Sequence, residues 1–133
     1  MKKGEEFGKV EDWIKIARID WQRVKRNLKE NDVPAAGFYL QQCLEKYLKA
    51  FLLQHGWKLK KIHELDALLD EAIKYKPELT SFYELCERVT GYYLAERYPP
   101  FDDLGISVAD VEKDMLEVKR LIQTIFPEEK LNG

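Results

Sequence analysis

The stretch "VPAAGFYLQQCLEKYLKAFLLQHG", residues 33–56, decides the fold class. At about 100° per residue, its large apolar side chains fill one half of a helix and its polar side chains gather on the other half. The apolar half comprises Leu40, Cys43, Leu44, Tyr47, Leu48 and Phe51, and the polar half comprises Gln41, Gln42, Glu45, Lys46 and Lys49. The stretch predicts one long amphipathic helix, with Pro34 in its first turn and Gly56 just after its end.

Further helices are predicted on both sides of this one, from apolar residues spaced three and four apart. The five predicted helices span residues 10–29, 33–55, 63–75, 78–96 and 107–126. Ser107 and Asp110 resemble a capping box at the start of the last helix. No segment alternates with a period of two, so we expect an all-α fold. Short connections favour antiparallel neighbours, and we predict a five-helix up-down bundle in a single domain over 1–133, with its core over about 8–126.

Small residues add expectations about packing. Gly91 lies inside a predicted helix, where glycine costs about 1 kcal/mol relative to Ala, so we expect a close helix contact or a bend there. Cys43 and Cys86 lie among apolar neighbours at helical spacing. This favours two buried, reduced core residues, and one disulfide is the alternative.

Composition excludes several classes of protein. The chain has 133 residues, of which 45% are hydrophobic and 12% aromatic, which excludes intrinsic disorder. Its formal net charge of -2 excludes attraction to nucleic acid by bulk charge alone, although local basic patches remain. No apolar run approaches the length of a membrane span, and the first residues lack the apolar stretch of a signal peptide. We therefore expect a cytoplasmic protein without a membrane association.

The usual patterns of catalytic and cofactor sites are absent from the sequence. Neither His55 nor His63 belongs to a Glu-x-x-His pair of the kind that holds di-iron in helical bundles. There is no glycine-rich phosphate loop and no nucleophile elbow. Cys43 and His55 are twelve residues apart on one predicted helix, too far along its axis to touch. We expect no metal and no cofactor.

Residues 35–69 resemble the HEPN domain, the nucleotide-binding domain shared by higher eukaryotes and prokaryotes. The matching features are Gln41-Gln42, Glu45-Lys46, Lys49-Ala50, Gly56, His63-x-Leu65 and the later "YYLAERYP" at residues 92–99. With the five helices in the expected order, the resemblance spans about residues 8–126.

The resemblance implies a bundle that dimerises and is encoded beside a small nucleotidyltransferase partner. Some family members are metal-independent ribonucleases of prokaryotic toxin–antitoxin systems. They use an arginine followed four to six residues later by a histidine, with the sites brought together across the dimer. Here no histidine follows Arg97, and no other arginine has one at that distance. Acid–base cleavage of RNA needs a group that titrates near neutrality, so we do not assign ribonuclease activity.

The resemblance instead favours a non-catalytic or degenerate HEPN homodimer that binds a nucleotidyltransferase partner and nucleotide or RNA. One alternative is a metal-independent ribonuclease toxin in which His63 or a tyrosine replaces the missing histidine. Another is a bundle with a purely structural, oligomer-building role.

The candidate contacts to nucleotide or RNA are Arg97, Tyr98, Lys46, Lys49, Gln42 and His63. Arg97 would hold phosphate through a bidentate contact while Tyr98 stacks on a base. The alternative for Arg97 is an ion pair with Asp102, Asp103 or Glu96. The lysines, with Gln42 and Glu45, either line a groove or form a solvated helix face. His63 is either a hydrogen-bonding residue at a helix start or a catalyst.

Surface composition raises similar alternatives. The basic residues of the predicted helix over 10–29 either contact RNA or form a solvated face. The chain also has more aromatic surface than a small bundle needs, and any of it left exposed would suit a dimer interface. The aromatic residues in question are Tyr47, Phe51, Trp57, Phe82, Tyr92 and Tyr93.

Overall fold

The computed structural model describes residues 9–58, 60–97 and 105–132, and only the backbone of residues 95–97. These residues form five α-helices and one 3₁₀-helix, and they contain no strand, so the predicted all-α class is confirmed. The elements are α2 (Val10–Lys29), α3 (Val33–Gln54), α4 (Leu65–Ile73), the 3₁₀-helix η1 (Pro77–Phe82), α5 (Tyr83–Arg97) and α6 (Val108–Ile125).

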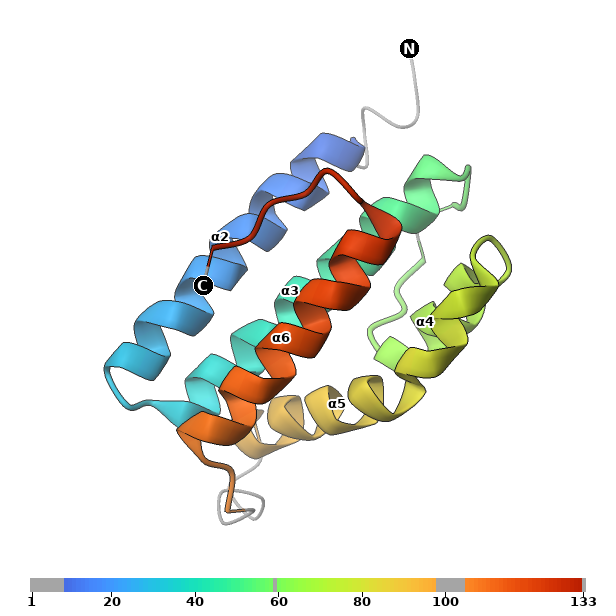
Figure 1. The fold of residues 1–133 in the computed structure, drawn as a ribbon. Coiled ribbons are helices and arrows are strands. Elements are labelled where there is room, and N and C mark those ends of the chain that lie inside the picture. Colours follow the sequence, from blue (N-terminus) through green and yellow to red (C-terminus); the bar gives the residue numbers. More distant parts are fainter. Residues whose placement is uncertain (1–8, 59, 98–104, 133) are drawn as a thin grey trace.

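Helix α3 is the centre of the bundle and contacts each of the other four α-helices. Figure 1 shows α2, α3 and α6 with their long axes aligned, while α5 runs across their lower ends and α4 lies to one side. Because neighbours cover α3 on several sides, most of its circumference is buried.

The burial of α3 extends to its polar residues. Leu44 and Leu48 are fully buried in the core, as the apolar pattern predicts. Gln41, Glu45 and Lys49 are only 3%, 6% and 4% exposed. The alternative of a solvated polar face is therefore wrong for Glu45 and Lys49, since the periodicity of one helix does not reveal how many neighbours will cover it.

The connection between α2 and α3 is a short turn shaped by local side-chain chemistry. Asn31 has a φ of 62°, in the left-handed region that Asn adopts more readily than most residues. Asp32 caps α3 through Oδ1, which accepts a hydrogen bond from the backbone N–H of Ala35 at 3.3 Å. Pro34 lies in the first turn of α3, and Gly56 takes a positive φ of 85° after its end. Local sequence thus determines both ends of the central helix.

The helix predicted over 78–96 is two elements in the structure, η1 and α5. Thr80 Oγ1 donates a hydrogen bond to the carbonyl oxygen of Pro77 at 2.7 Å, and Ser81 Oγ donates to that of Glu78 at 3.3 Å. These hydroxyls compete for backbone carbonyls in the first turns, where the tighter 3₁₀ geometry replaces the α-helix. The helix predicted over 63–75 is shorter than expected and begins at Leu65.

The expectations for the small residues have mixed outcomes. Cys43 and Cys86 are buried and free, as predicted. At Gly91 we expected a close helix contact or a bend, and the close contact is wrong, because a Cβ at this residue would have no heavy atom within 4 Å. The close contact is at Gly37 of α3, against Tyr92 of α5.

The apolar surface left outside the core is mainly aliphatic. The buried core includes Tyr47, Phe51, Trp57 and Tyr92. Among the described residues, the large exposed hydrophobic side chains are Ile16, Ile19, Tyr75 and Leu116. These four aromatic residues therefore serve the chain's own packing, and Phe82 and Tyr93 are half-buried. Aliphatic groups remain exposed on α2 and α6.

Candidate functional site

Two elements carry most of the predicted ligand contacts. Gln42, Lys46 and Lys49 lie on α3, and His63 lies in the segment that joins α3 to α4. This segment and α2 both contact the polar face of α3. The candidate site is therefore a set of polar side chains between packed elements.

Glu45 is the centre of a hydrogen-bonded group that we call the Glu45 cluster (Gln41, Gln42, Glu45, Lys49 and His63). Its Oε2 accepts a hydrogen bond from Lys49 Nζ at 2.9 Å and lies 2.9 Å from His63 Nδ1. Its Oε1 accepts a hydrogen bond from Gln41 Nε2 at 3.1 Å. Gln42 Nε2 donates to Gln41 Oε1 at 2.6 Å. The cluster thus places three of the predicted ligand contacts, Gln42, Lys49 and His63, around the carboxylate of Glu45. Glu45 itself was predicted only as a neighbour of these contacts.

Exposure separates the members of the Glu45 cluster. The side chains of Lys49 and Glu45 are 5% and 8% exposed, whereas that of His63 is 65% exposed. Lys49 Nζ also lies 5.6 Å from the centre of the Trp13 ring on α2. A buried ion pair is expensive to break, because either partner left alone is an uncompensated charge. His63 is thus the member that presents most of its side chain to solvent.

Lys46 belongs to a second group, the Asp20 cluster (Asp20, Arg23 and Lys46). The two oxygens of Asp20 bind different cations: Lys46 Nζ lies 2.5 Å from Oδ2, and Arg23 Nη1 lies 2.9 Å from Oδ1. Asp20 is fully buried. Arg23 also lies over the Tyr39 ring, 5.3 Å from its centre. This cluster joins α2 to α3 and holds Lys46 against the protein.

A third group, the Asp114 cluster (Arg88, Tyr92, Asp114 and Glu117), joins α5 to α6. Asp114 Oδ2 accepts a hydrogen bond from the Tyr92 hydroxyl at 2.6 Å, and Oδ1 accepts one from Arg88 Nη2 at 3.1 Å. Arg88 Nη2 also donates to Glu117 Oε2 at 2.6 Å. Burial and the hydrogen bond to Asp114 raise the pKa of Tyr92 above its ordinary value. A surface hollow of about 360 Å³ lies beside the cluster, lined in part by Lys113.

Sequence reasoning missed both buried aspartates, although the pattern contains a signal for them. Asp20 lies three residues after Ala17 and four before Val24, so it falls on the apolar stripe of its helix. Asp114 occupies the same kind of position, three residues after Val111. A carboxylate on an apolar stripe is a candidate buried acid that needs a cationic or hydroxyl partner.

Glu129, in the segment after α6, was also missed. Its carboxylate accepts hydrogen bonds from Arg18 Nε at 2.6 Å and from Arg18 Nη2 at 2.9 Å. It accepts a third from the Tyr47 hydroxyl at 2.6 Å. The hydrogen bonds from Arg18, against the opposing effect of burial, keep the pKa of Glu129 below its ordinary value, and Tyr47 lowers it further. Glu129 follows a proline outside any helix, so periodicity could not have identified it.

The remaining predicted contacts lie at the end of α5. Arg97 is the last residue of that helix, and its side chain is outside the described atoms. Tyr98, Asp102 and Asp103 are outside the described residues as well. Both alternatives for Arg97, a phosphate contact and an ion pair, therefore stay predictions.

The chemistry open to the described residues is limited. Within residues 9–58, 60–97 and 105–132, no group of three or more His, Cys, Asp or Glu side chains could hold a metal ion. None of the helices in these ranges is both long and apolar enough to cross a membrane. Among the described residues, the Glu45–His63 pair is an arrangement suited to acid–base catalysis. A carboxylate at Nδ1 orients the imidazole ring, and the other ring nitrogen can then exchange protons.

Comparison with models of known protein families gives one finding of relevance. The model described as the HEPN domain matches residues 10–129. No curated protein and no solved structure was found to match the chain.

Proposed function

The chain belongs to the HEPN domain family, and on that premise we propose that it is a HEPN domain without ribonuclease activity. In this proposal it forms a homodimer, binds a small nucleotidyltransferase partner and contacts nucleotide or RNA, as one half of a toxin–antitoxin-like module.

The observation that carries the proposal is the position of the two histidines. No arginine of the chain has a histidine four to six residues downstream, which is the pattern expected of the family's ribonucleases. His55 does not supply the missing group, because its ring stacks on Tyr75, with ring centres 4.5 Å apart, and meets the edge of Phe51 at 4.6 Å. His63 precedes Arg97 by 34 residues in the chain, so it does not occupy the position that the family's pattern requires. Without a histidine four to six residues after the arginine, the family's acid–base pair is incomplete in this sequence.

The burial of the predicted contacts refines their roles. Lys49 would have to leave Glu45 to reach a ligand, and Lys46 would have to leave Asp20. We therefore propose that these lysines and Gln42 hold the polar face of α3 in place. Direct contact with nucleotide or RNA falls to Arg97, Tyr98 and His63.

A cleavage assay tests the absence of catalysis. Purified protein is incubated with end-labelled single-stranded RNA in the presence of EDTA, and the products are resolved by electrophoresis. We expect no cleavage above that of a buffer control. Robust, metal-independent cleavage that His63→Ala abolishes would refute the proposal.

The same outcome would establish the second candidate function, a ribonuclease with a non-standard site. The observation in its favour is the 2.9 Å separation of Glu45 Oε2 and His63 Nδ1, with most of the His63 side chain exposed. In that mechanism His63 Nε2 would take the proton of a ribose 2′-hydroxyl, and Glu45 would orient the ring. Glu45→Gln should then lower the rate without abolishing RNA binding.

Assembly is tested separately. Light scattering at tens of micromolar should give the mass of a dimer. Co-expression with the nucleotidyltransferase encoded by a neighbouring gene, followed by gel filtration, should give a stable complex. A monomer that forms no such complex would leave the structural role of the bundle as the better account.

A further inference from the structure

The chain's own C-terminal segment turns back from the end of α6 and runs along α2 (Figure 1). With the adjoining hollow between α2 and α6, the place that this segment fills forms what we call the α2/α6 groove. Arg18 of α2 binds both oxygens of the Glu129 carboxylate, at 2.6 Å and 2.9 Å. Trp21 Nε1 donates a hydrogen bond to the backbone carbonyl of Asn132 at 2.7 Å. Leu131, between them, is only 6% exposed. This part of the groove therefore accepts a segment that combines a carboxylate with a buried aliphatic side chain.

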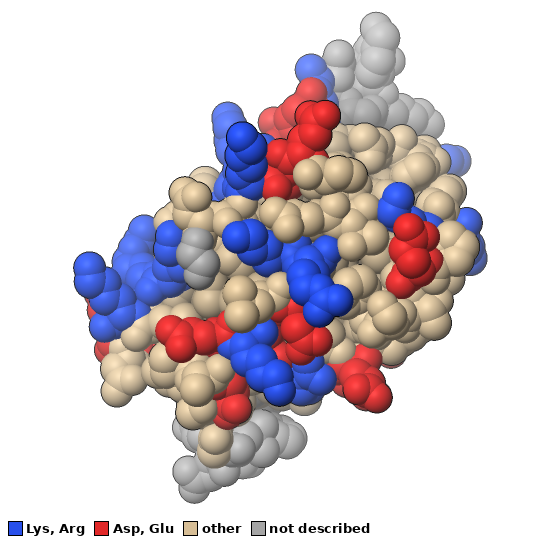
Figure 2. All heavy atoms as spheres, viewed as in Figure 1, with Lys and Arg blue, Asp and Glu red and all other residues tan. Residues whose placement is uncertain are grey.

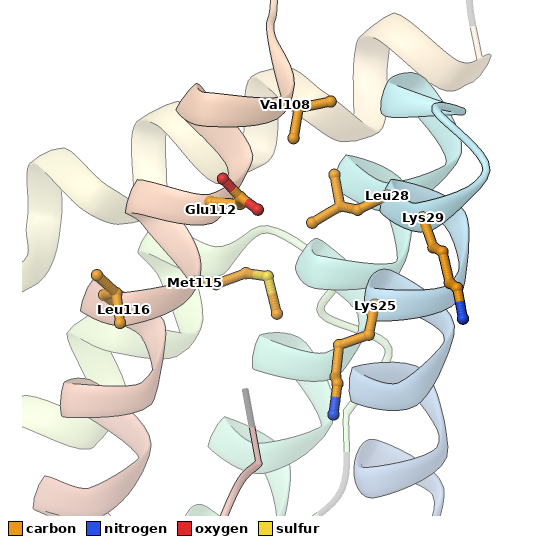
Figure 3. Close-up of a pocket in the computed structure, with 7 residues that line it drawn as sticks. All are labelled: Lys25, Leu28, Lys29, Val108, Glu112, Met115 and Leu116. Carbon is orange, nitrogen blue, oxygen red and sulfur yellow. The ribbon is translucent and has the colours of Figure 1, made fainter.

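The groove continues beyond this segment as an open hollow of about 420 Å³. Its walls are Lys25, Leu28 and Lys29 of α2 and Val108, Glu112, Met115 and Leu116 of α6. Figure 3 shows Leu28 and Met115 reaching into the hollow from opposite walls, with Lys25 beside them. Lys25 is one helical turn after Trp21, the residue that holds Asn132, so the filled and open halves are adjacent along α2.

The α2 wall of the open half is electropositive, whereas α6 contributes the carboxylate of Glu112 to the opposite wall. Helix α2 carries six Lys and Arg residues and three Asp and Glu residues, although the whole chain has a net charge of -2. Among the described residues, Lys25 and Lys29 have no acidic partner within 4.0 Å, and the same is true of Lys15 and Arg26 on the same helix. Figure 2 shows basic side chains along the edge of the molecule at the left of the view. An occupant with carboxylates would be complementary to this wall.

The exposed apolar groups around the groove distinguish between two kinds of anionic partner. Single-stranded nucleic acid binds where bases can stack on aromatic rings. The aromatic residue of this part of α2, Trp21, is buried at 1% exposure. The exposed groups are aliphatic instead, with Leu116 at 62% on the wall of the hollow and Ile19 at 46% beside the C-terminal segment. Aliphatic surface beside cations suits a protein segment better than RNA.

We propose that the open half of the α2/α6 groove binds a segment of a partner protein in which aliphatic side chains are flanked by carboxylates. The occupant repeats the chemistry that Leu131 and Glu129 use in the filled half. The inference rests on the part of the proposed function that gives this chain a protein partner, and it identifies the surface involved.

The test uses the full chain and a fluorescein-labelled synthetic peptide of repeated Leu-Leu-Glu-Glu units. Fluorescence anisotropy should show binding that weakens as salt rises, since the lysines are near the surface. The double variant Lys25→Glu with Lys29→Glu should bind at least about tenfold more weakly, because two attractions become repulsions. The matched control is Lys58→Glu with Lys61→Glu, which reverses two exposed lysines outside the groove. It should bind as the unmodified chain does, and circular dichroism should show both variants folded.

Other results would overturn the proposal. Equal peptide binding by the two double variants would exclude the groove, as would no binding at all. Oligo-uridine that binds through Lys25 and Lys29, where the peptide does not, would make the surface a nucleic-acid site. A dimer that Leu116→Ser converts to a monomer in sedimentation would show that a second copy occupies the groove.

The same variants separate this inference from the proposed function. A nucleotidyltransferase partner that still binds the Lys25→Glu, Lys29→Glu chain at full affinity refutes the groove as its site and leaves the proposed function intact. If the peptide requires the groove but no nucleotidyltransferase complex forms, the groove inference stands and that part of the proposed function fails.

Discussion

A Cβ atom placed on Gly37 would lie 2.7 Å from Cβ and 2.8 Å from Cγ of Tyr92. Helices α3 and α5 therefore approach at a point where α3 has no side chain. The Tyr92 hydroxyl also donates a hydrogen bond to Asp114 on α6. One aromatic residue thus connects three helices, and its position depends on the absence of a methyl group at residue 37.

Replacing Gly37 by Ala should destabilise the fold by about 1–3 kcal/mol, because the added methyl must displace a buried ring. Gly91→Ala is the matched control. It adds the same atoms at an open position inside a helix, so it should be neutral or stabilising by up to about 1 kcal/mol. Urea denaturation of both variants measures the difference. Equal effects would show that the contact with Tyr92 relaxes at little cost.

Replacing one member of the buried Glu45–Lys49 pair should lower the free energy of unfolding far more than replacing both members. Either Glu45→Met or Lys49→Met leaves a charged side chain buried without its main partner, and we expect a loss of about 3–5 kcal/mol. The double variant should lose much less than the sum of the two single losses. Denaturant unfolding of the three variants completes the cycle. Additive losses would mean that the two side chains do not interact in the folded protein.

The Arg18–Glu129 contact should make stability depend on pH. Since the pKa of Glu129 is lowered on folding, its contribution is present above the ordinary carboxyl range and is lost as pH falls through the folded value. Glu129→Gln should therefore cost about 1–3 kcal/mol at pH 7. The difference between the variant and the unmodified chain should shrink in acid. Thermal unfolding across pH measures it, and a difference independent of pH would contradict the assignment.

The two cysteines should be unreactive in the folded chain. Burial raises the pKa of the Cys86 thiol to about 12, and burial likewise raises that of Cys43. The thiolate is the reactive species, so a thiol reagent at neutral pH should label neither residue until the protein is denatured. Rapid labelling of one thiol under native conditions would indicate local opening of α3 or α5.

Arg97 should affect ligand binding more than stability if it contacts phosphate. Arg97→Ala should then weaken nucleotide or RNA binding by about 1–3 kcal/mol, the range of a lost charge-assisted contact. Arg97→Lys should recover only part of this, because an ammonium lacks the planar donor fork. Titrations at two salt concentrations, with melting curves, test the claim. An unchanged titration together with a lower melting temperature would favour an ion pair at this residue.

The sequence by itself determined the all-α class and the positions of most of the helices. Apolar spacing placed α2 and α6 within one residue of their observed ends. Pro34 in the first turn of α3 and the Ser107–Asp110 capping box were readable because both signals are local, within a few residues of a helix start. The free, buried state of both cysteines followed from their neighbours on the same helices.

Only the tertiary structure decided which polar groups are buried and which small residue is a contact point. The pairs Glu45–His63 and Arg18–Glu129 join residues 18 and 111 positions apart in the chain. Periodicity within one helix says nothing about such partners, because they are set by how neighbouring elements pack. For the same reason the close contact was expected at Gly91 and lies at Gly37: helix propensity is local, whereas the distance between two helices is a property of the whole bundle.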